Sequence, residues 1–294
     1  MFSLIQKVKA FGTYTGVVSQ MPWVHKVFQD NPLMRTTKPS PFMQAVRKTV
    51  DTRLENGETE GRPDLLSHFI ASHKEYPSMD KFQVLITTSG NLIAGGLSPS
   101  KTFNEICYFL ARNVDAQDRL FHELEPSFPT SYDEVKQIGY LEGVIKEALR
   151  LHSSTSFNLQ RVTGPQGLQL PNGVRIPPRV NIGSPAGAIN QDSRVFGTDS
   201  ELYKPERWMQ GEKETFDAYQ ERRKLMERTD LSFGHGSRTC IGKNIALMEM
   251  FKAVATLVGQ FKVSAILLRE QRLMSLKVRA GGCFDEGRGY GHGA

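Results

Sequence analysis

Ten consecutive residues, Phe233 to Gly242, carry the pattern FGHGSRTCIG and include a single cysteine, Cys240. This glycine-rich loop leads into a strongly apolar segment that is typical of a helix. A cysteine at the N-terminus of a helix lies near free backbone N–H groups and the positive end of the helix dipole, which stabilise a thiolate. Gly236 would permit a tight turn, and Gly242 would let the helix backbone lie close to a flat macrocycle. The pattern therefore indicates a thiolate that ligates a metal ion.

Two other side chains of the loop fit the same chemistry. Phe233 can cover the sulfur atom, and Arg238 can pair with a carboxylate of a bound cofactor. Taken alone, Cys240 would more often be a buried structural thiol beside a chance glycine loop. Five matched positions within one short window favour the metal-ligating interpretation over that alternative.

With these residues the chain resembles the cytochrome P-450 superfamily, whose signature FxxGxRxCxG is matched at every fixed position. The resemblance implies a heme b cofactor whose iron is ligated by the Cys240 thiolate. It also implies that Phe233, Gly236, Arg238 and Gly242 surround this cofactor. Segments 21–23 and 186–208 are similar to fungal members of the family, many of which serve secondary metabolism.

Two further segments fit the resemblance. Glu147 and Arg150 form an ExxR pair, and at this spacing the two charges share one helix face. The PERW segment 205–208 would supply Arg207 as a third member of the network. An ExxR pair alone is commonly a surface ion pair. Its position before PERW and the cysteine loop favours a buried network that fixes the geometry of the heme site.

Less specific matches concern the distal side of the cofactor. Arg161 falls where the family often has a second arginine for the heme propionates. The long helical segment that begins near residue 79 resembles the oxygen-binding helix of the family, in which an acid and an alcohol deliver protons. Leu97 stands at the acid position and Ser98 at the alcohol position, followed by Pro99. Ser98 is therefore the candidate proton donor, and weak coupling of reductant use to product is expected.

Composition excludes several other classes of protein. The chain has 294 residues and a net charge of +6, but its basic residues are spread, so nucleic-acid binding is not expected. The three cysteines lie too far apart to indicate a disulfide framework. No apolar stretch reaches the roughly 18 residues of a transmembrane span. Motifs of hydrolases, zinc proteases and phosphate-binding loops are absent from the sequence.

The periodicity of apolar residues predicts a mainly α fold with a small β part, as in the C-terminal portion of the cytochrome P-450 fold. We expect strands within 156–185, mostly coil with short helices over 186–235, and strand fragments after 261. Helix-breaking residues at 94–99 predict a break or kink in the long helix. One heme-binding domain would cover residues 1–280, and the glycine-rich tail 281–294 would be disordered. Helices are predicted at about 41–54, 64–73, 79–113, 115–125, 132–138, 139–152 and 241–261.

The resemblance implies a monooxygenase that inserts one oxygen atom from dioxygen into an apolar small molecule, with electrons from an NADPH–flavoprotein reductase. Because the oxygen-binding helix begins so early, the N-terminal half of the family fold would be lacking. Two alternatives stay open: a truncated non-catalytic remnant, and a reductase-independent heme-thiolate isomerase or dehydratase. Family members usually lie at the endoplasmic reticulum membrane. This chain shows no membrane anchor, so a cytoplasmic location also stays open.

Overall fold

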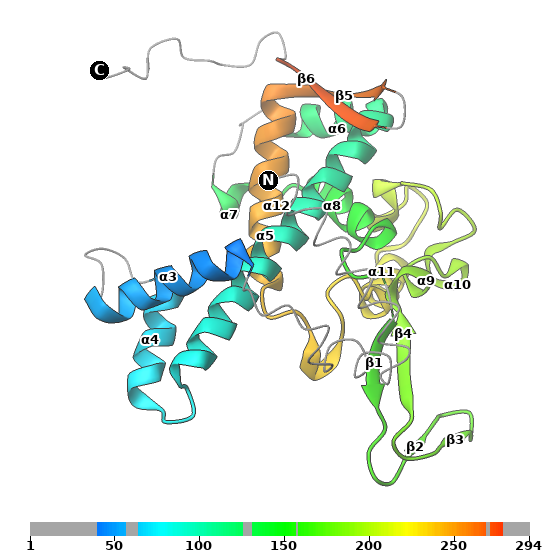
Figure 1. Ribbon diagram of the computed structural model, residues 1–294. Coiled ribbons are helices and arrows are strands. Elements are labelled where there is room, and N and C mark those ends of the chain that lie inside the picture. Colours follow the sequence, from blue (N-terminus) through cyan, green and yellow to red (C-terminus); the bar gives the residue numbers. More distant parts are fainter. Residues whose placement is uncertain (1–39, 57–63, 126–130, 157, 269–270, 279–294) are drawn as a thin grey trace, which may run out of the picture. The chain divides into compact units, whose positions relative to one another are not determined.

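The computed structural model describes residues 40–56, 64–125, 131–156, 158–268 and 271–278 (Figure 1). The chain divides into two compact units, residues 1–94 and 95–294. The expectation of one domain over residues 1–280 stays a prediction. The predicted disordered tail, 281–294, lies outside the described residues.

The first unit contains α3 (Pro41–Asn56), α4 (Leu65–Glu75) and the beginning of α5 (Lys81–Arg112). The Ser40 hydroxyl accepts a hydrogen bond from the Met43 N–H at 3.2 Å, as a helix-capping residue does. Asp64 caps α4 in the same way, and its carboxylate accepts from the Ser67 N–H at 2.8 Å. The predicted helices 41–54 and 64–73 are thereby confirmed. Their apolar faces form a small core of Val46, Val50, Leu66, Ile70 and Val84.

Helix α5 is continuous from Lys81 to Arg112, so the expected break at 94–99 does not occur. Pro99 lies inside the helix and has no N–H to donate to the preceding turn, which costs about 3 kcal/mol. Burial of other residues of the helix offsets this loss, since Ile106 and Leu110 are completely buried.

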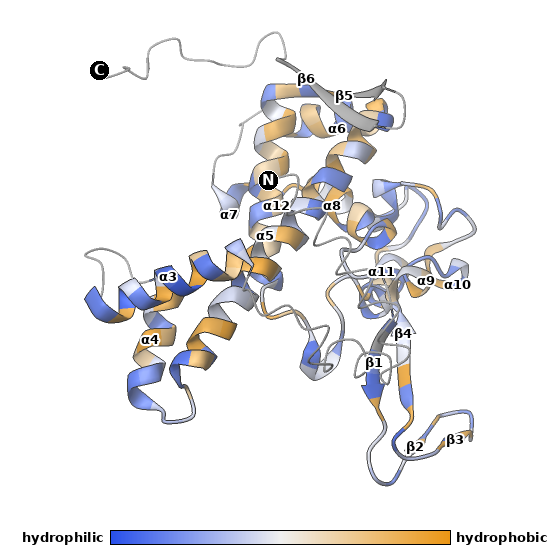
Figure 2. Cartoon of the chain, in the orientation of Figure 1, coloured by the Kyte–Doolittle hydropathy of each residue, from blue (hydrophilic) through white to orange (hydrophobic). Residues whose placement is uncertain are grey.

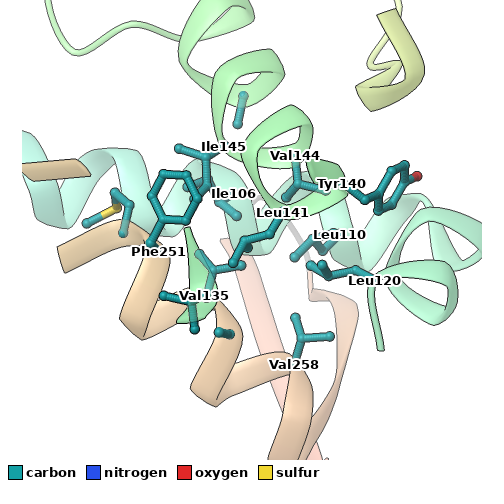
Figure 3. Packing of buried hydrophobic residues seen from close by; sticks show 14 of the residues in the cluster. Ile106, Leu110, Leu120, Val135, Tyr140, Leu141, Val144, Ile145, Phe251 and Val258 are labelled. Carbon is teal, nitrogen blue, oxygen red and sulfur yellow. The ribbon is translucent and has the colours of Figure 1, made fainter. Parts of the chain in front are cut away.

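The core of the second unit lies between the C-terminal part of α5 and the helices α6 (Val114–Leu124), α7 (Tyr132–Val135), α8 (Gly139–Leu151) and α12 (Lys243–Gln260). Figure 3 shows side chains of this cluster converging between the helices, among them Leu141 of α8 and Phe251 and Val258 of α12. Much of α12 consists of hydrophobic residues, as Figure 2 shows. The predicted helices at 115–125, 132–138, 139–152 and 241–261 are confirmed, although α7 ends at Val135.

Among the described residues, the β part consists of three antiparallel pairs. Strands β1 (Asn158–Val162) and β4 (Asn181–Pro185) pair with Arg161 opposite Ile182, and β2 (Leu168–Gln169) pairs with β3 (Arg175–Ile176). After α12, β5 (Phe261–Leu268) pairs with β6 (Gln271–Val278). The buried Gln117 side chain of α6 holds β5 in place, since it bonds both the N–H and the carbonyl of Val263. The predicted sheet and terminal strands are confirmed.

The segment between β4 and the cysteine loop contains α9 (Ala186–Ile189), α10 (Ser193–Phe196), the 3-10 turn η1 (Pro205–Trp208) and α11 (Phe216–Thr229). Helix α11 has 14 residues, longer than the short helices expected there. Its sequence is strongly polar and only Met226 is buried, so apolar periodicity gave little signal. A Thr215 cap and an ion pair from Arg223 to Glu227 stabilise it instead.

The fold of the described residues is mainly α with a small β part, as predicted. In the part of the chain that the structure describes, every helix is too short or too polar to cross a lipid bilayer.

Candidate functional site

Glu147 and Arg150 face the interior from successive turns of α8, and both side chains are completely buried. The Arg150 guanidinium donates to the two carboxylate oxygens of Glu147, at 2.9 Å from Nε and 2.7 Å from Nη2. Its remaining N–H groups donate to three backbone carbonyls, those of Asn190, Ser200 and Leu202. All five donors of the guanidinium are therefore used, which is what a buried arginine requires.

The Glu147 carboxylate also binds the PERW segment. It accepts hydrogen bonds from Arg207 Nε at 3.2 Å, from the Trp208 indole N–H at 2.9 Å and from the Lys204 backbone N–H at 3.2 Å. With these, one buried carboxylate serves two arginines and an indole. We call Glu147, Arg150, Arg207 and Trp208 the buried charge network.

Arg207 extends this network toward the surface. Its Nη1 donates to Asp199 at 2.6 Å and to the Phe196 carbonyl, and its Nη2 donates to the Asp199 carbonyl at 2.9 Å. Hydrogen bonds from Arg207, and then from Lys204, lower the pKa of Asp199 to about 2. Asp199 is therefore ionised at neutral pH and balances the second arginine.

Two glycines let the backbone come close enough for these contacts. At Gly143 of α8, an added Cβ would lie 2.7 Å from the Pro205 carbonyl oxygen, so a larger residue would push η1 away. Gly197 ends α10 with φ of 86°, a conformation that favours glycine, and turns the chain toward Asp199.

Residues 231–242, which we call the thiol loop, contain hydrogen bonds between their own backbone groups. The Gly234 N–H donates to the Leu231 carbonyl at 2.9 Å, and the Cys240 N–H donates to the Phe233 carbonyl at 2.8 Å. Gly234 and Gly236 both have φ of 71°. These positive angles explain why glycine is used at the two turns of the loop.

Cys240 lies two residues before Gly242, the residue that precedes α12, and its thiol is exposed. Gly242 is the N-cap residue of the helix, and its carbonyl accepts the Ala246 N–H at 2.9 Å. A Cβ added at Gly242 would lie 4.0 Å from the Cys240 sulfur. Glycine therefore leaves the backbone beside the sulfur open to a ligand.

The surroundings of Cys240 fit a flat, largely apolar group with carboxylate substituents. Ile241 is 100% exposed, and Ile245 and Met248 on the first turns of α12 are also exposed. The Arg238 side chain is exposed and pairs with no acid among the described residues. A thiol, an apolar surface and an unpaired arginine are the groups that would bind the iron, the ring and a propionate of a heme.

The other predicted site residues occupy different places. Phe233 is partly buried against the core of the second unit, with the Lys243 ammonium 5.6 Å from its ring centre. Ser98 is exposed on α5, and its carbonyl accepts the Ser154 hydroxyl at 3.0 Å. Arg161 is exposed on β1 and donates to the adjacent Gln160 carbonyl. The described contacts do not bring Ser98 or Arg161 to Cys240, and their roles stay predictions.

Sequence reasoning missed three members of this arrangement. Trp208 belongs to the PERW segment, but only Arg207 of that segment was given a role. Asn190 carries no spacing signal, because its partner Arg150 lies 40 positions away. Asp199 carries none, because it lies in a loop eight positions before Arg207, a spacing that no regular element fixes. Their local sequences, an Asp-Ser pair after a helix and an Asn at the end of a helix, are too common to indicate a functional role.

A family model for cytochrome P-450 matches residues 17–278 of the sequence. The chain belongs to this family. A cytochrome P-450 monooxygenase of Aspergillus candidus, cfoH, is 34% identical over 259 residues, which cover 85% of this chain and 48% of the relative. Another from Penicillium aethiopicum, gsfF, is 34% identical over 243 residues, covering 76% of this chain and 45% of the relative. The chain thus spans about half the length of the curated relatives it matches.

Membership in the cytochrome P-450 family implies a heme iron cofactor. The similarity to fungal relatives agrees with the resemblance seen in segments 21–23 and 186–208.

Proposed function

We propose that this chain is the heme-binding portion of a monooxygenase, with the Cys240 thiolate as the iron ligand. The observation that carries the proposal is the exposed Cys240 thiol shortly before α12, within a loop that matches the family signature. Relatives that share most of this chain's length are named cytochrome P-450 monooxygenases, which supports the same reaction class.

The residues around Cys240 have separable roles in this proposal. Cys240 binds the iron through its sulfur atom as a thiolate. Gly242 keeps the neighbouring backbone open, and Ile241 supplies apolar contact. The Arg238 guanidinium binds a propionate carboxylate. When bound, the heme supplies the activation of dioxygen and the transfer of one oxygen atom to an apolar small molecule.

Electrons for this reaction would come from an NADPH–flavoprotein reductase, as the family implies. The substrate class follows from the apolar cofactor pocket of the family, and the fungal relatives favour a step of secondary metabolism.

Proton delivery would rest on the Ser98 hydroxyl, because Leu97 cannot hold or move a proton. We therefore expect peroxide to form at the expense of product. Peroxide released per NADPH consumed measures this directly, and Leu97→Glu should lower the ratio. Tight coupling in the unaltered chain would contradict the role given to Leu97.

The decisive experiment is the carbon monoxide difference spectrum of the reduced, heme-loaded chain. We expect a strongly red-shifted Soret band, which Cys240→Ser abolishes. Cys107→Ala is the matched control, since Cys107 is buried in α5 and its loss leaves the Cys240 thiol in place. An unshifted band in the unaltered chain, or no retained heme, would overturn the proposal and favour a non-catalytic remnant.

The leucine at the acid position favours a second candidate, a heme-thiolate isomerase or dehydratase acting on peroxides. Such an enzyme needs neither reductase nor proton relay, so Leu97 would be no handicap. Turnover of a hydroperoxide without NADPH and reductase would support this candidate, and strict dependence on both would exclude it.

A further inference from the structure

Asn190 is a completely buried polar residue that lies between the two parts of the candidate site. It is the C-cap of α9, and its N–H donates to the Ala186 carbonyl at 2.9 Å. Ala186 is itself fully buried, and Gly187 packs against Ser156, so other contacts also hold this short helix. Asn190 is therefore held in place by more than its own side chain.

The backbone of Asn190 contacts the buried charge network. Its backbone carbonyl oxygen accepts a hydrogen bond from Arg150 Nη1 at 2.8 Å, and the same guanidinium binds both carboxylate oxygens of Glu147. The backbone of Asn190 is thus fixed relative to α8 by a charge-assisted hydrogen bond.

The side chain of Asn190 holds the beginning of the thiol loop. Its side-chain oxygen accepts the Leu231 N–H at 2.8 Å, and its side-chain nitrogen donates to the Ser232 hydroxyl at 3.2 Å. An asparagine amide has one acceptor and one donor group, so it can hold two consecutive residues at once. Leu231 and Ser232 are 41 and 42 residues away in the sequence, so this contact is not a local turn.

Two backbone hydrogen bonds continue from this contact to the thiol. The Leu231 carbonyl accepts the Gly234 N–H and shapes the first turn of the loop. The Phe233 carbonyl then accepts the Cys240 N–H at 2.8 Å. A displacement of Leu231 and Ser232 would therefore move the residue that holds the Cys240 backbone.

We propose that Asn190 is a positioning residue, whose side-chain amide fixes the thiol loop relative to the buried charge network and so sets the place of Cys240. A buried asparagine without a positioning role would also need hydrogen-bond partners. It would not need those partners to be two consecutive residues of the thiol loop. The consequence for iron ligation rests on the proposed function, whereas the consequence for loop order does not.

Hydrogen exchange of the full chain tests the effect on loop order without heme. Asn190→Ala removes both side-chain contacts and keeps the carbonyl that Arg150 binds. We expect the amides of residues 231–242 to exchange about tenfold faster, the effect of losing about 1.4 kcal/mol of local hydrogen bonding. Ser232→Ala should also speed exchange, because it removes one Asn190 contact and the hydrogen bond from the Ser232 hydroxyl to Asp230.

Asn113→Ala is the matched control for this experiment. The Asn113 side chain is partly buried and donates to a backbone carbonyl, that of Phe109, but it lies between α5 and α6. The Asn113→Ala variant should leave the rate of amide exchange in residues 231–242 unchanged. Unchanged exchange there in Asn190→Ala, or an equal increase over the whole chain, would overturn the positioning role.

The spectrum of the heme-loaded chain tests the effect on the iron ligand. In Asn190→Ala we expect part of the carbon monoxide complex to shift from the red-shifted band to the unshifted position, at equal heme content. The full red-shifted band in Asn190→Ala would overturn the inference for ligation. Absence of that band from the unaltered chain would instead overturn the proposed function, and the exchange result would still decide the effect on loop order.

Discussion

The buried charge network and the thiol loop belong to the same candidate site but differ in burial and in how their polar groups are paired. Glu147 and Arg150 are completely buried, and every N–H of the Arg150 guanidinium has an acceptor within the protein. Cys240, Ile241 and Arg238 are exposed. The network is complete from the chain's own residues, while the loop leaves its chemical groups available to a ligand. The difference predicts that substitutions in the first region change stability and those in the second change binding.

The largest expected effect is that of Glu147→Gln. The substitution keeps the shape but removes the charge that balances Arg150 and Arg207, and a stranded buried charge costs about 3–5 kcal/mol. Urea denaturation followed by circular dichroism measures the loss. Glu123→Gln is the matched control, because Glu123 pairs with Arg119 on the surface and should contribute less than about 1 kcal/mol. Equal losses of unfolding free energy in the two variants would show that the buried charge network contributes no more to stability than a surface ion pair.

Gly143→Ala should be the next most damaging change. The added methyl would lie 2.7 Å from the Pro205 carbonyl oxygen, and relieving this overlap costs about 1–3 kcal/mol. Gly139→Ala on the same helix has nothing within 4 Å of its added methyl, so it should be neutral or stabilising by up to about 1 kcal/mol. Thermal unfolding of the two variants compares them directly. Loss of stability in both would indicate that helix α8, and not its contact with η1, is sensitive.

A partly exposed ion cluster between α8 and α11 should have a smaller, pH-dependent effect. Burial opposes ionisation of Glu142, but Lys146 and Arg223 outweigh it and hold its pKa below the ordinary 4.5. The same balance lowers the pKa of Glu227. A lowered folded-state pKa stabilises the protein above the unfolded-state value, and this stabilisation is lost as the pH falls through the folded-state value.

We therefore expect the thermal midpoint to fall below about pH 4.5, and to fall less steeply in Arg223→Gln. Lys213→Gln, a basic residue just before α11 that no described ion pair includes, is the control and should leave the slope as it is. Parallel slopes in the unaltered chain and Arg223→Gln would show that the cluster makes no pH-dependent contribution.

The smallest effect on stability is expected in the thiol loop. Ile241→Ser and Arg238→Ala change exposed side chains, so the free energy of unfolding should shift by no more than about 0.5 kcal/mol. Heme retained per chain after gel filtration should nevertheless fall in both. A large loss of stability with unchanged heme content would show that the thiol loop contributes to stability and not to heme binding, contrary to the prediction.

Motif spacing predicted the parts of the site that depend on a few fixed residue types. Glu147, Arg150 and Arg207 form the expected network, because charges at fixed positions before a specific cysteine loop leave few alternatives. Helices with a regular apolar face were predicted for the same reason, since burial of that face decides their structure.

The remainder depended on contacts that local sequence does not encode. Asn190 binds residues more than 40 positions away, and α11 is stabilised by ion pairs and not by an apolar face. The break expected near Pro99 was wrong because propensity is a weak guide where buried residues such as Ile106 stabilise the rest of a helix. Tertiary contacts decided all three.

The pairing of Glu147 with Arg207 joins residues 60 positions apart and so closes a long loop. The β2–β3 hairpin lies within it, with an exposed turn at Asn172 and at Gly173, where φ is 85°. The entropy of closing a loop grows only with the logarithm of its length, so ten residues added to the five between β2 and β3 would cost about 1 kcal/mol. The hairpin turn is therefore a place where an epitope or a reporter peptide can be inserted while the heme-binding region keeps its structure.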